Sequence, residues 1–448
     1  MEFTDLYKQS NSALVKFSPD GQYIAVAVEH RLIVRDAQTP KRIHRVYSCA
    51  YETAPYIQEV AWSADSQYLL TASYQNNRVD VWSLDDEQWR CAIHDEVARI
   101  ERAQWGPDSR HILTLSELDL RLSIWSLLGG EERRYIQGPK GAVGIAVHPS
   151  GGFIAVAQRH DYRDYVGIYD AEEWRMVREV ELTGLEDAVG MAWSPDGLHL
   201  VAWDTASSYS VVVINIAGLV KRHYAPEDAG LGVRRCAWAP SGQLLALGGY
   251  DRRVRVLNNL TWRPVAVLTH RTTVSGDVDA FTETEVEQTL AQTSSALLNS
   301  QPTRRHTRFD LEPMPVQIRV VIPADVHRAA NAEDGRGFLA FNAEGTLLAS
   351  VVEAMPNALW IWRVADMRLV TVVQTLAPLR SCQWSPVESV LAFVTGAGTV
   401  YVWKQEHGCH LYEIPAASLA VGGVAWNPNG DSLAVLSKGV FSLAFLTE

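Results

Sequence analysis

A short pattern that recurs nine times along the 448 residues is the feature that most constrains the fold. Each copy is an apolar run that usually ends in Trp or Phe, then a turn of the Ser-Pro-Asp-Gly kind, then a second apolar run. The residues just before the turn are Phe17, Trp62, Trp105, Val147, Trp193, Trp238, Phe341, Trp384 and Trp426. Their spacings are 45, 43, 42, 46, 45, 103, 43 and 42 residues, so all but one fall between 42 and 46. Such a period indicates one repeated supersecondary unit.

Each copy also carries the alternation expected of further strands. Val79–Trp82 and Val400–Trp403 alternate with period two and predict a third strand, and a fourth begins near Trp174 or Trp262. Four strands in about 40–45 residues are typical of a propeller blade. The sequence therefore predicts an all-β, closed β-propeller. Nine repeat units are counted, and we expect seven to nine blades because rings of about four to eight are usual. Most of the 15 tryptophans occupy repeat positions, which indicates packing between blades.

The two ends of the chain complement each other. The last copy stops after its third strand, Phe441–Phe445, while Phe3–Lys8 precedes the first copy. We expect the N-terminal segment to supply the missing outer strand of the last blade, because closure removes a strand edge that would otherwise template aggregation.

One segment interrupts the repeats and divides the chain. Residues 1–269 hold blades 1–6, residues 270–331 form an insertion, and residues 332–448 hold blades 7–9. The insertion is polar around Thr282–Thr289, so we expect it to be flexible. We expect the segment from about Thr272 to Arg308 to be dispensable for folding, because closure entropy grows slowly with loop length. A short helix is the alternative, with Phe281, Leu290, Leu297 and Leu298 along one side. Because the insertion joins an outer strand to the next inner strand, it should emerge on the face of the second-to-third-strand loops.

Composition and motifs exclude several classes of function. The net charge of −12 is unfavourable for binding a phosphate backbone. The longest apolar stretch, Val211–Val220, is too short for a spanning helix, which needs about 20 residues. The five scattered cysteines suit a reducing cytosol. No catalytic signature is found, and His407–His410 is too tightly spaced for a tetrahedral metal site. We therefore expect no enzymatic activity, no cofactor and no metal.

The candidate functional residues are surface loops. Three second-to-third-strand loops concentrate Arg, Tyr and Asp, and Arg and Tyr are enriched at interface hot spots. Ordinary solvated loops with local salt bridges are the alternative. The candidates for partner binding are Arg159, Asp161, Tyr162, Arg163, Asp164, Tyr165, Tyr209, Tyr250, Asp251, Arg252 and Arg253.

The repeats resemble the WD-repeat superfamily. The resemblance rests on turns such as Trp193–Gly197 and on third strands that end in Trp. No copy has an intact Trp-Asp dipeptide, since Trp82 and Trp125 are followed by Ser and Trp403 by Lys. Few copies should therefore form the Asp-His-Ser/Thr-Trp hydrogen-bond network of that superfamily.

Several segments are more specific and resemble the WD repeat-containing protein eight family in order along the chain. These segments are Asp164–Val166, Val201–Thr205, Gly249–Asp251, Val254–Asn258, Thr261–Trp262, Pro356–Trp362 and Leu436–Lys438. The resemblance implies a non-catalytic scaffold in the cytoplasm and cytoskeleton, at the centrosome or spindle pole. It would anchor microtubule minus ends and support spindle and cilium assembly. The implied partners are a coiled-coil anchoring factor and, as in fungi, a minus-end-directed kinesin-fourteen. The alternative is a substrate-receptor propeller of a ubiquitin ligase or another multiprotein complex, which differs only in its partner.

Overall fold

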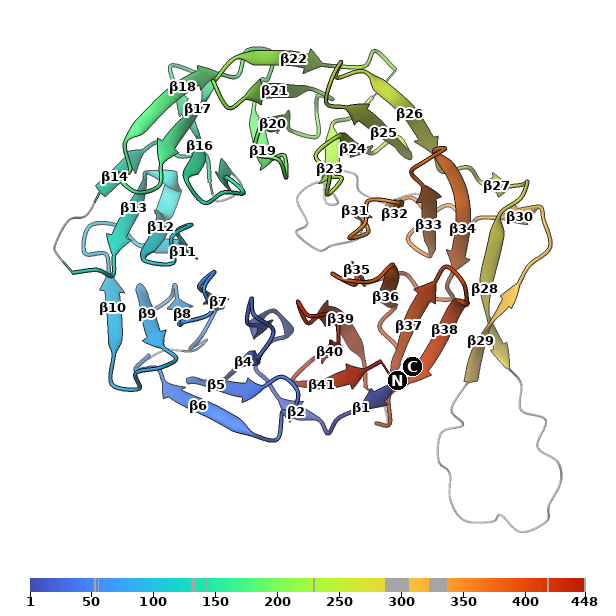
Figure 1. Cartoon of the computed structure of the whole chain (residues 1–448), viewed down its shortest axis with the longest axis horizontal. Coiled ribbons are helices and arrows are strands. Elements are labelled where there is room, and N and C mark those ends of the chain that lie inside the picture. The colour runs from blue at the N-terminus through green and yellow to red at the C-terminus, as the bar shows by residue number, and fades with distance from the viewer. Residues whose placement is uncertain are drawn as a thin grey trace, which may run out of the picture.

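Nine antiparallel β-sheets stand side by side around a central axis as the blades of a closed ring (Figure 1). The computed structural model describes residues 1–51, 54, 56–129, 134–141, 144–228, 230–286, 306–321, 337–416 and 419–446. Each blade is a meander in which the first strand lies innermost and the fourth outermost. The predicted all-β propeller of four-stranded blades is confirmed, and each of the nine repeat units forms one blade.

The strands of the first five blades follow the sequence repeat closely. Blade 1 comprises β3 (Val15–Phe17), β4 (Tyr23–Val28), β5 (Arg31–Asp36) and β6 (Ile43–Ser48). Blade 2 comprises β7 (Glu59–Trp62), β8 (Tyr68–Ser73), β9 (Arg78–Ser83) and β10 (Arg90–His94). Blade 3 comprises β11 (Ile100–Trp105), β12 (His111–Ser116), β13 (Arg121–Ser126) and β14 (Arg134–Gln137). Blade 4 comprises β15 (Ile145–Val147), β16 (Phe153–His160), β17 (Arg163–Asp170) and β18 (Met176–Glu181). Blade 5 comprises β19 (Ala188–Trp193), β20 (His199–Asp204), β21 (Val211–Asn215) and β22 (Val220–Tyr224).

The remaining blades lie on either side of the insertion. Blade 6 comprises β23 (Val233–Trp238), β24 (Leu244–Gly249), β25 (Arg253–Asn258) and β26 (Pro264–Thr269). Blade 7 comprises β31 (Phe338–Phe341), β32 (Leu347–Val351), β33 (Ala358–Arg363) and β34 (Arg368–Gln374). Blade 8 comprises β35 (Ser381–Trp384), β36 (Val390–Val394), β37 (Thr399–Lys404) and β38 (Gly408–Glu413). Blade 9 comprises β39 (Val421–Trp426), β40 (Ser432–Ser437) and β41 (Val440–Phe445), with β1 (Glu2–Phe3) and β2 (Tyr7–Lys8).

Helical structure is limited to two single turns of 3-10 helix in the described ranges, η1 (Ser12–Leu14) and η2 (Glu117–Asp119). A search of the described residues finds no helix with the length and apolar character needed to cross a membrane.

In five blades the repeated Trp links the blade to the one before it. The indole Nε1 of Trp62 donates to the carbonyl of Lys16 at 3.0 Å, and Trp105 donates to Ala61 at 3.1 Å. The same bond recurs at Trp193, Trp384 and Trp426. In each case the acceptor lies on the inner strand of the preceding blade. In these five blades the Trp therefore also docks the blade on its neighbour, because the rings are largely buried and a buried indole N–H favours an acceptor. Trp238 of blade 6 is an exception, since its buried Nε1 has no hydrogen-bond partner in the described part of the chain.

The Ser-Pro-Asp-Gly turns are set by local chemistry. Ser18 donates from its hydroxyl to Asp20 at 2.5 Å, and the amide of Gly21 donates to the Ser18 carbonyl at 2.9 Å. Gly21 has φ +71°, a left-handed conformation that glycine adopts without strain. The tryptophans expected to open the fourth strands lie instead in the preceding turns. Trp174 and Trp262 have φ values of +54° and +55°, and their strands begin later, at Met176 and Pro264.

The predicted closure of the ring is confirmed. β1 pairs antiparallel with β41, with Phe3 opposite Ala444, and β2 pairs with the same strand, with Tyr7 opposite Phe441. The amide of Leu443 also donates to Thr4 Oγ1 at 3.0 Å. The N-terminal segment thus completes blade 9 beside strands that lie more than 400 residues later (Figure 1).

The expectation of a flexible insertion is wrong for the part that the structure describes. Four strands form there: β27 (Thr273–Val274), β28 (Asp279–Val286), β29 (His306–Leu311) and β30 (Val316–Gln317). β27 pairs with β30, and β28 pairs with β29 and, in parallel, with β34. Blade 7 therefore becomes a six-stranded sheet, and β28 and β29 lie on the outer circumference of the ring (Figure 1). The alternative helix is wrong at Phe281, which lies in β28, while Leu290, Leu297 and Leu298 lie outside the described residues.

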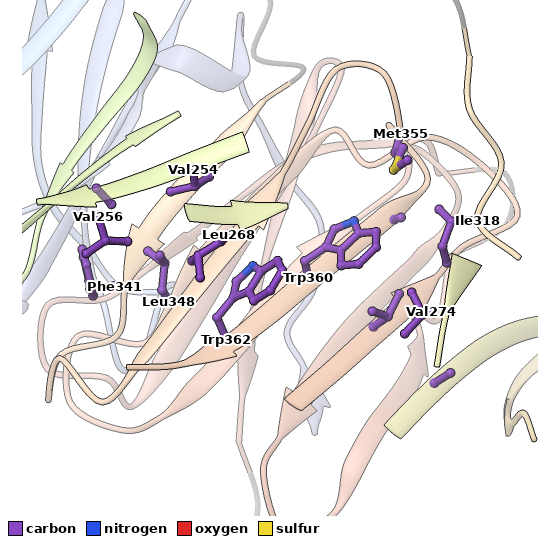
Figure 2. Packing of buried hydrophobic residues seen from close by; sticks show 14 of the residues in the cluster. Val254, Val256, Leu268, Val274, Ile318, Phe341, Leu348, Met355, Trp360 and Trp362 are labelled. Atoms are coloured by element: carbon purple, nitrogen blue, oxygen red, sulfur yellow. The ribbon is translucent and has the colours of Figure 1, made fainter. Parts of the chain in front are cut away.

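The insertion also contributes to the hydrophobic core between blades 6 and 7. Val274 and Ile318 are buried in the same cluster as Met355 and Trp360. Figure 2 shows Trp360 between Leu268 on one side and Val274 and Ile318 on the other. These contacts argue against the expectation that Thr272 to Arg308 is dispensable for folding, because removing buried apolar side chains leaves cavities.

Two buried polar residues tie the insertion to the propeller. His270 Nδ1 donates to the carbonyl of Arg252 at 2.9 Å, and Ser350 Oγ lies 2.8 Å from His270 Nε2 and 3.0 Å from the Nε1 of Trp362. Blade 7 thus forms the His-Ser-Trp part of the superfamily's network, although a carbonyl takes the place of the Asp. Farther along, Glu283 accepts hydrogen bonds from Tyr401 at 2.7 Å and from the amide of Leu376 at 2.9 Å.

Candidate protein-interaction surface

The candidate residues lie on loops that join the second strand to the third in blades 4, 5 and 6. These loops connect β16 to β17, β20 to β21, and β24 to β25. Because all blades have the same strand order, the three loops open on the same side of the ring, which we call the loop face. Blades 4, 5 and 6 follow one another around the ring, so the candidates are spread over three neighbouring loops of this face (Figure 1).

The hairpin of blade 4 projects farther than its neighbours. β16 and β17 have eight residues each, whereas the corresponding strands of blades 5 and 6 have five or six. The tip residues Asp161 and Tyr162 have φ values of +51° and +61°, as a type I′ turn requires. Tyr162 is 96% exposed. The hairpin thus presents one aromatic side chain at its tip with no cover from the described residues.

The base of this hairpin is held by charged groups that satisfy one another. Lys140 Nζ lies 2.6 Å from Asp164 Oδ2 and 2.5 Å from Asp187 Oδ1, and Arg159 Nη1 lies 2.9 Å from the same Asp187 oxygen. Burial opposes ionisation of Asp187, but the hydrogen bond and charge of Lys140 hold its pKa below the ordinary value. Asp164 is buried and accepts a hydrogen bond from the amide of Ala188 at 2.7 Å. Its assignment as a partner-binding residue is therefore wrong, because its carboxylate fastens blade 4 to the start of blade 5.

Tyr165 and Arg163 of blade 4 already form contacts with other residues of the same blade. The ring of Tyr165 stacks on that of His160 with 3.8 Å between centroids. Arg163 forms an ion pair with Glu181 at 2.8 Å, in which the Arg163 side chain is well exposed and that of Glu181 partly exposed. An exposed pair of this kind contributes little to stability, about 0–1 kcal/mol, and leaves Arg163 available for exchange with another carboxylate.

Tyr209 is a second wrong assignment. Only 5% of its surface is exposed, its hydroxyl donates to the carbonyl of Leu247 at 3.3 Å, and burial raises its pKa. The guanidinium of Arg255 lies over the Tyr209 ring, 4.8 Å from the centroid. Arg255 is itself almost fully buried and bonds to Asp251 at 2.7 Å. Tyr209 and Asp251 therefore surround a buried cation, and the exposed Arg253 forms an ion pair with Asp228.

A groove of about 160 Å³ opens between blades 6 and 7 on the loop face. Its apolar lining includes Leu231, Val254, Leu339, Val351 and Val352. Its polar lining includes Arg234, Arg235, Tyr250, Arg252 and Glu353. Sequence reasoning identified Tyr250 and Arg252 but missed the rest, because it considered only loops joining second and third strands, whereas Arg234 and Arg235 lie on the inner strand β23.

The arginines of this groove differ in their partners. Arg234 Nε bonds to Glu353 at 2.9 Å. The Nε of Arg235 is buried without a hydrogen-bond partner in the described part of the chain, and burial, followed by the charge of Arg234, lowers the pKa of Arg235. No carboxylate of the described ranges forms an ion pair with Arg235 or Arg252. The groove therefore combines apolar walls with two guanidinium groups that have no ion-pair partner in the described part of the chain, although Glu353 lies near enough to Arg235 to act on its pKa.

A second hollow, of about 640 Å³, lies between blades 3 and 4 and is lined in part by Arg121, Tyr135, Gln137 and Arg159. Its main cation is already neutralised: Arg121 Nη2 bonds to both carboxylate oxygens of Asp95, and its guanidinium lies over the Tyr135 ring. Among the described residues, no group of three or more His, Cys, Asp or Glu side chains is placed to hold a metal ion.

Comparisons with known proteins agree with this architecture. The family model described as "WD domain, G-beta repeat" matches residues 220–258. The chain is 36% identical over 457 residues to the mouse WD repeat-containing protein WRAP73, which covers 100% of this chain and 96% of the mouse protein. It is 23% identical over 324 residues to an uncharacterized WD repeat-containing protein of Schizosaccharomyces pombe, C32H8.09, covering 68% of this chain and 62% of that protein.

A solved structure with a similar outline is the Cps50 (Swd1) β-propeller domain from Myceliophteria thermophila, with 15% identity, a TM-score of 0.42, and coverage of 100% and 99% of the two chains. That likeness is too weak to support any argument. Fold and repeat define a WD-repeat propeller, a class that is generally non-catalytic and binds protein partners. The chain belongs to the family of WD repeat-containing protein WRAP73, which is the WD repeat-containing protein eight family indicated by the sequence segments.

Proposed function

We propose that this protein is a scaffold at the microtubule-organising centre, where it links a coiled-coil anchoring factor, and in some settings a minus-end-directed kinesin-fourteen, to microtubule minus ends. The observation that carries the proposal is the relationship to WRAP73 over the whole length of both proteins. The location follows from what the family resemblance implies. Support for spindle and cilium assembly belongs to the same proposal.

The loop face offers a surface suited to such a role. The repeat tryptophans are occupied between blades, so partner recognition depends on side chains that the propeller leaves exposed. Tyr162, at the tip of the blade 4 hairpin, and Arg163, in a weak surface ion pair, are the strongest such residues of that hairpin. An aromatic side chain and an adjacent cation are the residue types enriched at interface hot spots.

The test combines localisation with partner identification. The tagged full-length protein is imaged against a spindle-pole marker and purified for mass spectrometry. We expect enrichment at spindle poles together with coiled-coil spindle-pole proteins. A diffuse distribution with cullin adaptors among the main partners would overturn the proposal and favour the ubiquitin-ligase alternative.

A matched pair of variants then tests the loop face. The variant with Tyr162→Ala and Arg163→Ala should fold normally and retain less coiled-coil partner. Leu260→Ala is the control, because Leu260 is 88% exposed and lies in the turn between β25 and β26, on the opposite face. Equal partner recovery with both variants would move the binding site away from the blade 4 hairpin.

A further inference from the structure

The groove between blades 6 and 7 has the size of one large apolar side chain. Its volume of about 160 Å³ is close to the roughly 150 Å³ of an engineered apolar cavity that admits benzene. Val254 on β25 and Leu339 on β31 line it from opposite blades. Gly248 lines it without a side chain, and a Cβ there would lie 3.4 Å from Leu339 Cδ2. The absence of that carbon keeps the apolar part of the groove open.

Arg252 is held in place by the buried network of blade 7. Both the backbone amide and the Nδ1 of His270 donate to the Arg252 carbonyl, at 3.0 and 2.9 Å. Arg252 has φ +59°, a left-handed conformation that costs a non-glycine residue of order 1 kcal/mol or more. Left-handed φ values recur in the same turn of blades 1, 2 and 4, at Glu29, Asn77 and Tyr162, so this conformation belongs to the repeated turn. The two hydrogen bonds to its carbonyl are what fix the backbone of Arg252. Arg252 lines the groove, and its guanidinium has no carboxylate partner in the described part of the chain.

Ion pairing distinguishes two arginines of the groove from the other arginines in and beside it. Arg234 pairs with Glu353, Arg253 with Asp228, and Arg255 with Asp251. Arg235 and Arg252 are the two groove arginines without such a partner in the described ranges, and the Nε of Arg235 is also desolvated. A desolvated guanidinium N–H without an acceptor, here the Nε of Arg235, is unfavourable, so an anion that enters the groove would gain a stronger interaction than on the open surface.

We propose that this groove binds a short acidic-apolar segment of a partner protein, with a carboxylate facing Arg235 and Arg252 and a neighbouring Leu- or Phe-sized side chain against Leu339 and the other apolar walls of the groove. The inference rests on the proposed function as an interaction scaffold and names the chemistry of one partner. Arginine pairs with a carboxylate through two parallel hydrogen bonds, which gives orientation as well as affinity. The walls supply the apolar contact that a carboxylate alone would lack.

The charges around the groove favour a peptide over a nucleic acid. A nucleic acid needs an extended positive stripe, whereas Glu353, Asp251 and Asp228 neutralise the arginines next to the groove, and the whole chain carries −12. Long-range repulsion from an acidic chain also selects against ligands that carry many negative charges. The site therefore suits one or two carboxylates beside an apolar residue.

The experiment measures peptide binding to the full-length protein by fluorescence anisotropy. The probe is a labelled peptide with the sequence Gly-Ser-Glu-Glu-Leu-Ser-Gly-Ser, compared with peptides that carry Gln-Gln or two phosphoserines in place of Glu-Glu and with one that carries Ser in place of Leu. We expect saturable binding of the first peptide, and binding about ten-fold weaker or worse when either Glu-Glu or Leu is replaced. Binding should weaken as salt rises from about 50 to about 300 mM.

Three variants locate the binding site. The double variant R235Q/R252Q removes both charges and should lose at least about ten-fold in affinity. Gly248→Val keeps the charges but fills the apolar part of the groove, and should also abolish binding. Arg253→Gln is the matched control, because Arg253 lies beside Arg252 but pairs with Asp228. Circular dichroism verifies that each variant is folded.

Several results would overturn the proposal. They are no saturable binding by the wild type, equal binding of the Gln-Gln peptide, binding by the phosphoserine peptide alone, or unchanged binding by both R235Q/R252Q and Gly248→Val. These results are distinguishable from failure of the proposed function. A protein that enriches at spindle poles with coiled-coil partners but ignores the peptides loses only the groove assignment.

Discussion

Blades 7 and 9 both receive strands from outside their own repeats, but in opposite circumstances. Blade 9 has only three strands of its own, and β1 supplies the fourth by pairing antiparallel with β41. Blade 7 already has four strands, and β28 adds a fifth in parallel to β34. The first addition completes a blade, whereas the second covers the edge of a complete one. The outer edge of blade 9 therefore serves to close the ring, whereas the outer edge of blade 7 serves to attach the insertion.

The anchoring of the two added strands differs accordingly. The N-terminal strands are held mainly by backbone pairing, with help from Thr4 and from the Gln9 amide, which donates to the Val440 carbonyl at 3.0 Å. The insertion is held by buried side chains, namely Glu283 and His270, beside the apolar contacts of Val274 and Ile318. Parallel pairing is slightly weaker per residue than antiparallel pairing, so these contacts matter more for blade 7.

The largest effect should follow from removing the strands that close the ring. Deleting residues 1–9 strips β1 and β2 from blade 9 and exposes the edge of β41. We expect a loss on the order of 5 kcal/mol in the free energy of unfolding, from lost apolar burial and backbone hydrogen bonds, together with self-association. Urea denaturation and size-exclusion chromatography measure both. A monomeric truncated protein of unchanged stability would show that blade 9 does not depend on its borrowed strands.

The next effect concerns pH and the network of blade 7. Burial lowers the pKa of His270 to about 4, while the unfolded chain titrates near the ordinary value of 6.5. The unfolded state binds more protons between these values, so stability is full above pH 6.5 and falls as pH decreases toward 4, by up to roughly 3 kcal/mol. We expect His270→Gln to be less stable at pH 7.5, with a gap to the wild type that narrows below pH 6.5. A gap that stays constant from pH 7.5 to 4.5 would contradict a neutral, buried His270.

A smaller effect should come from the carboxylate that fastens β28. Replacing Glu283 with Ala leaves the Tyr401 hydroxyl and the Leu376 amide without their acceptor, and we expect a loss of about 2 kcal/mol in unfolding free energy. Glu285→Ala is the control, because Glu285 lies on the same strand with an exposed side chain. Thermal denaturation of both variants makes the comparison. If the two variants are equally stable, Glu283 does not attach the insertion to blades 7 and 8.

The repeat made the ring predictable because its determinants are local. The repeats contain turns fixed by residues such as Ser, Asp and Gly, and many repeats contain a Trp that donates to the preceding blade. These residues recur at a regular spacing in the sequence, so the blades can be recognised from it. Closure was predictable as well, since a unit with three strands at one end of the chain matched spare residues at the other. Both features can be recognised locally: the blades from the residues of a single repeat, and the closure from a repeat that lacks its fourth strand.

The insertion and the groove could not be predicted in the same way. β28 pairs with β34 about 90 residues later, so the low complexity of residues around Thr282 concealed a strand whose partner is remote. Asp164 and Tyr209 were assigned to the surface because loop position alone does not reveal burial against a neighbouring blade. Arg235 was missed because the angle between adjacent blades, and not strand alternation, decides that it borders a groove.

The closure of blade 9 has a consequence for how the protein is made. Thr4 and Ser442 are hydrogen-bonding neighbours separated by 438 residues, so the first strand leaves the ribosome long before its partner. At about 5–20 residues per second, translation of that interval takes roughly 20 to 90 s. During this time the early blades are able to form, but their circle has a gap and β1 has nothing to pair with. The nascent chain therefore needs protection, by a chaperone or by its own slow synthesis, until the final strand arrives.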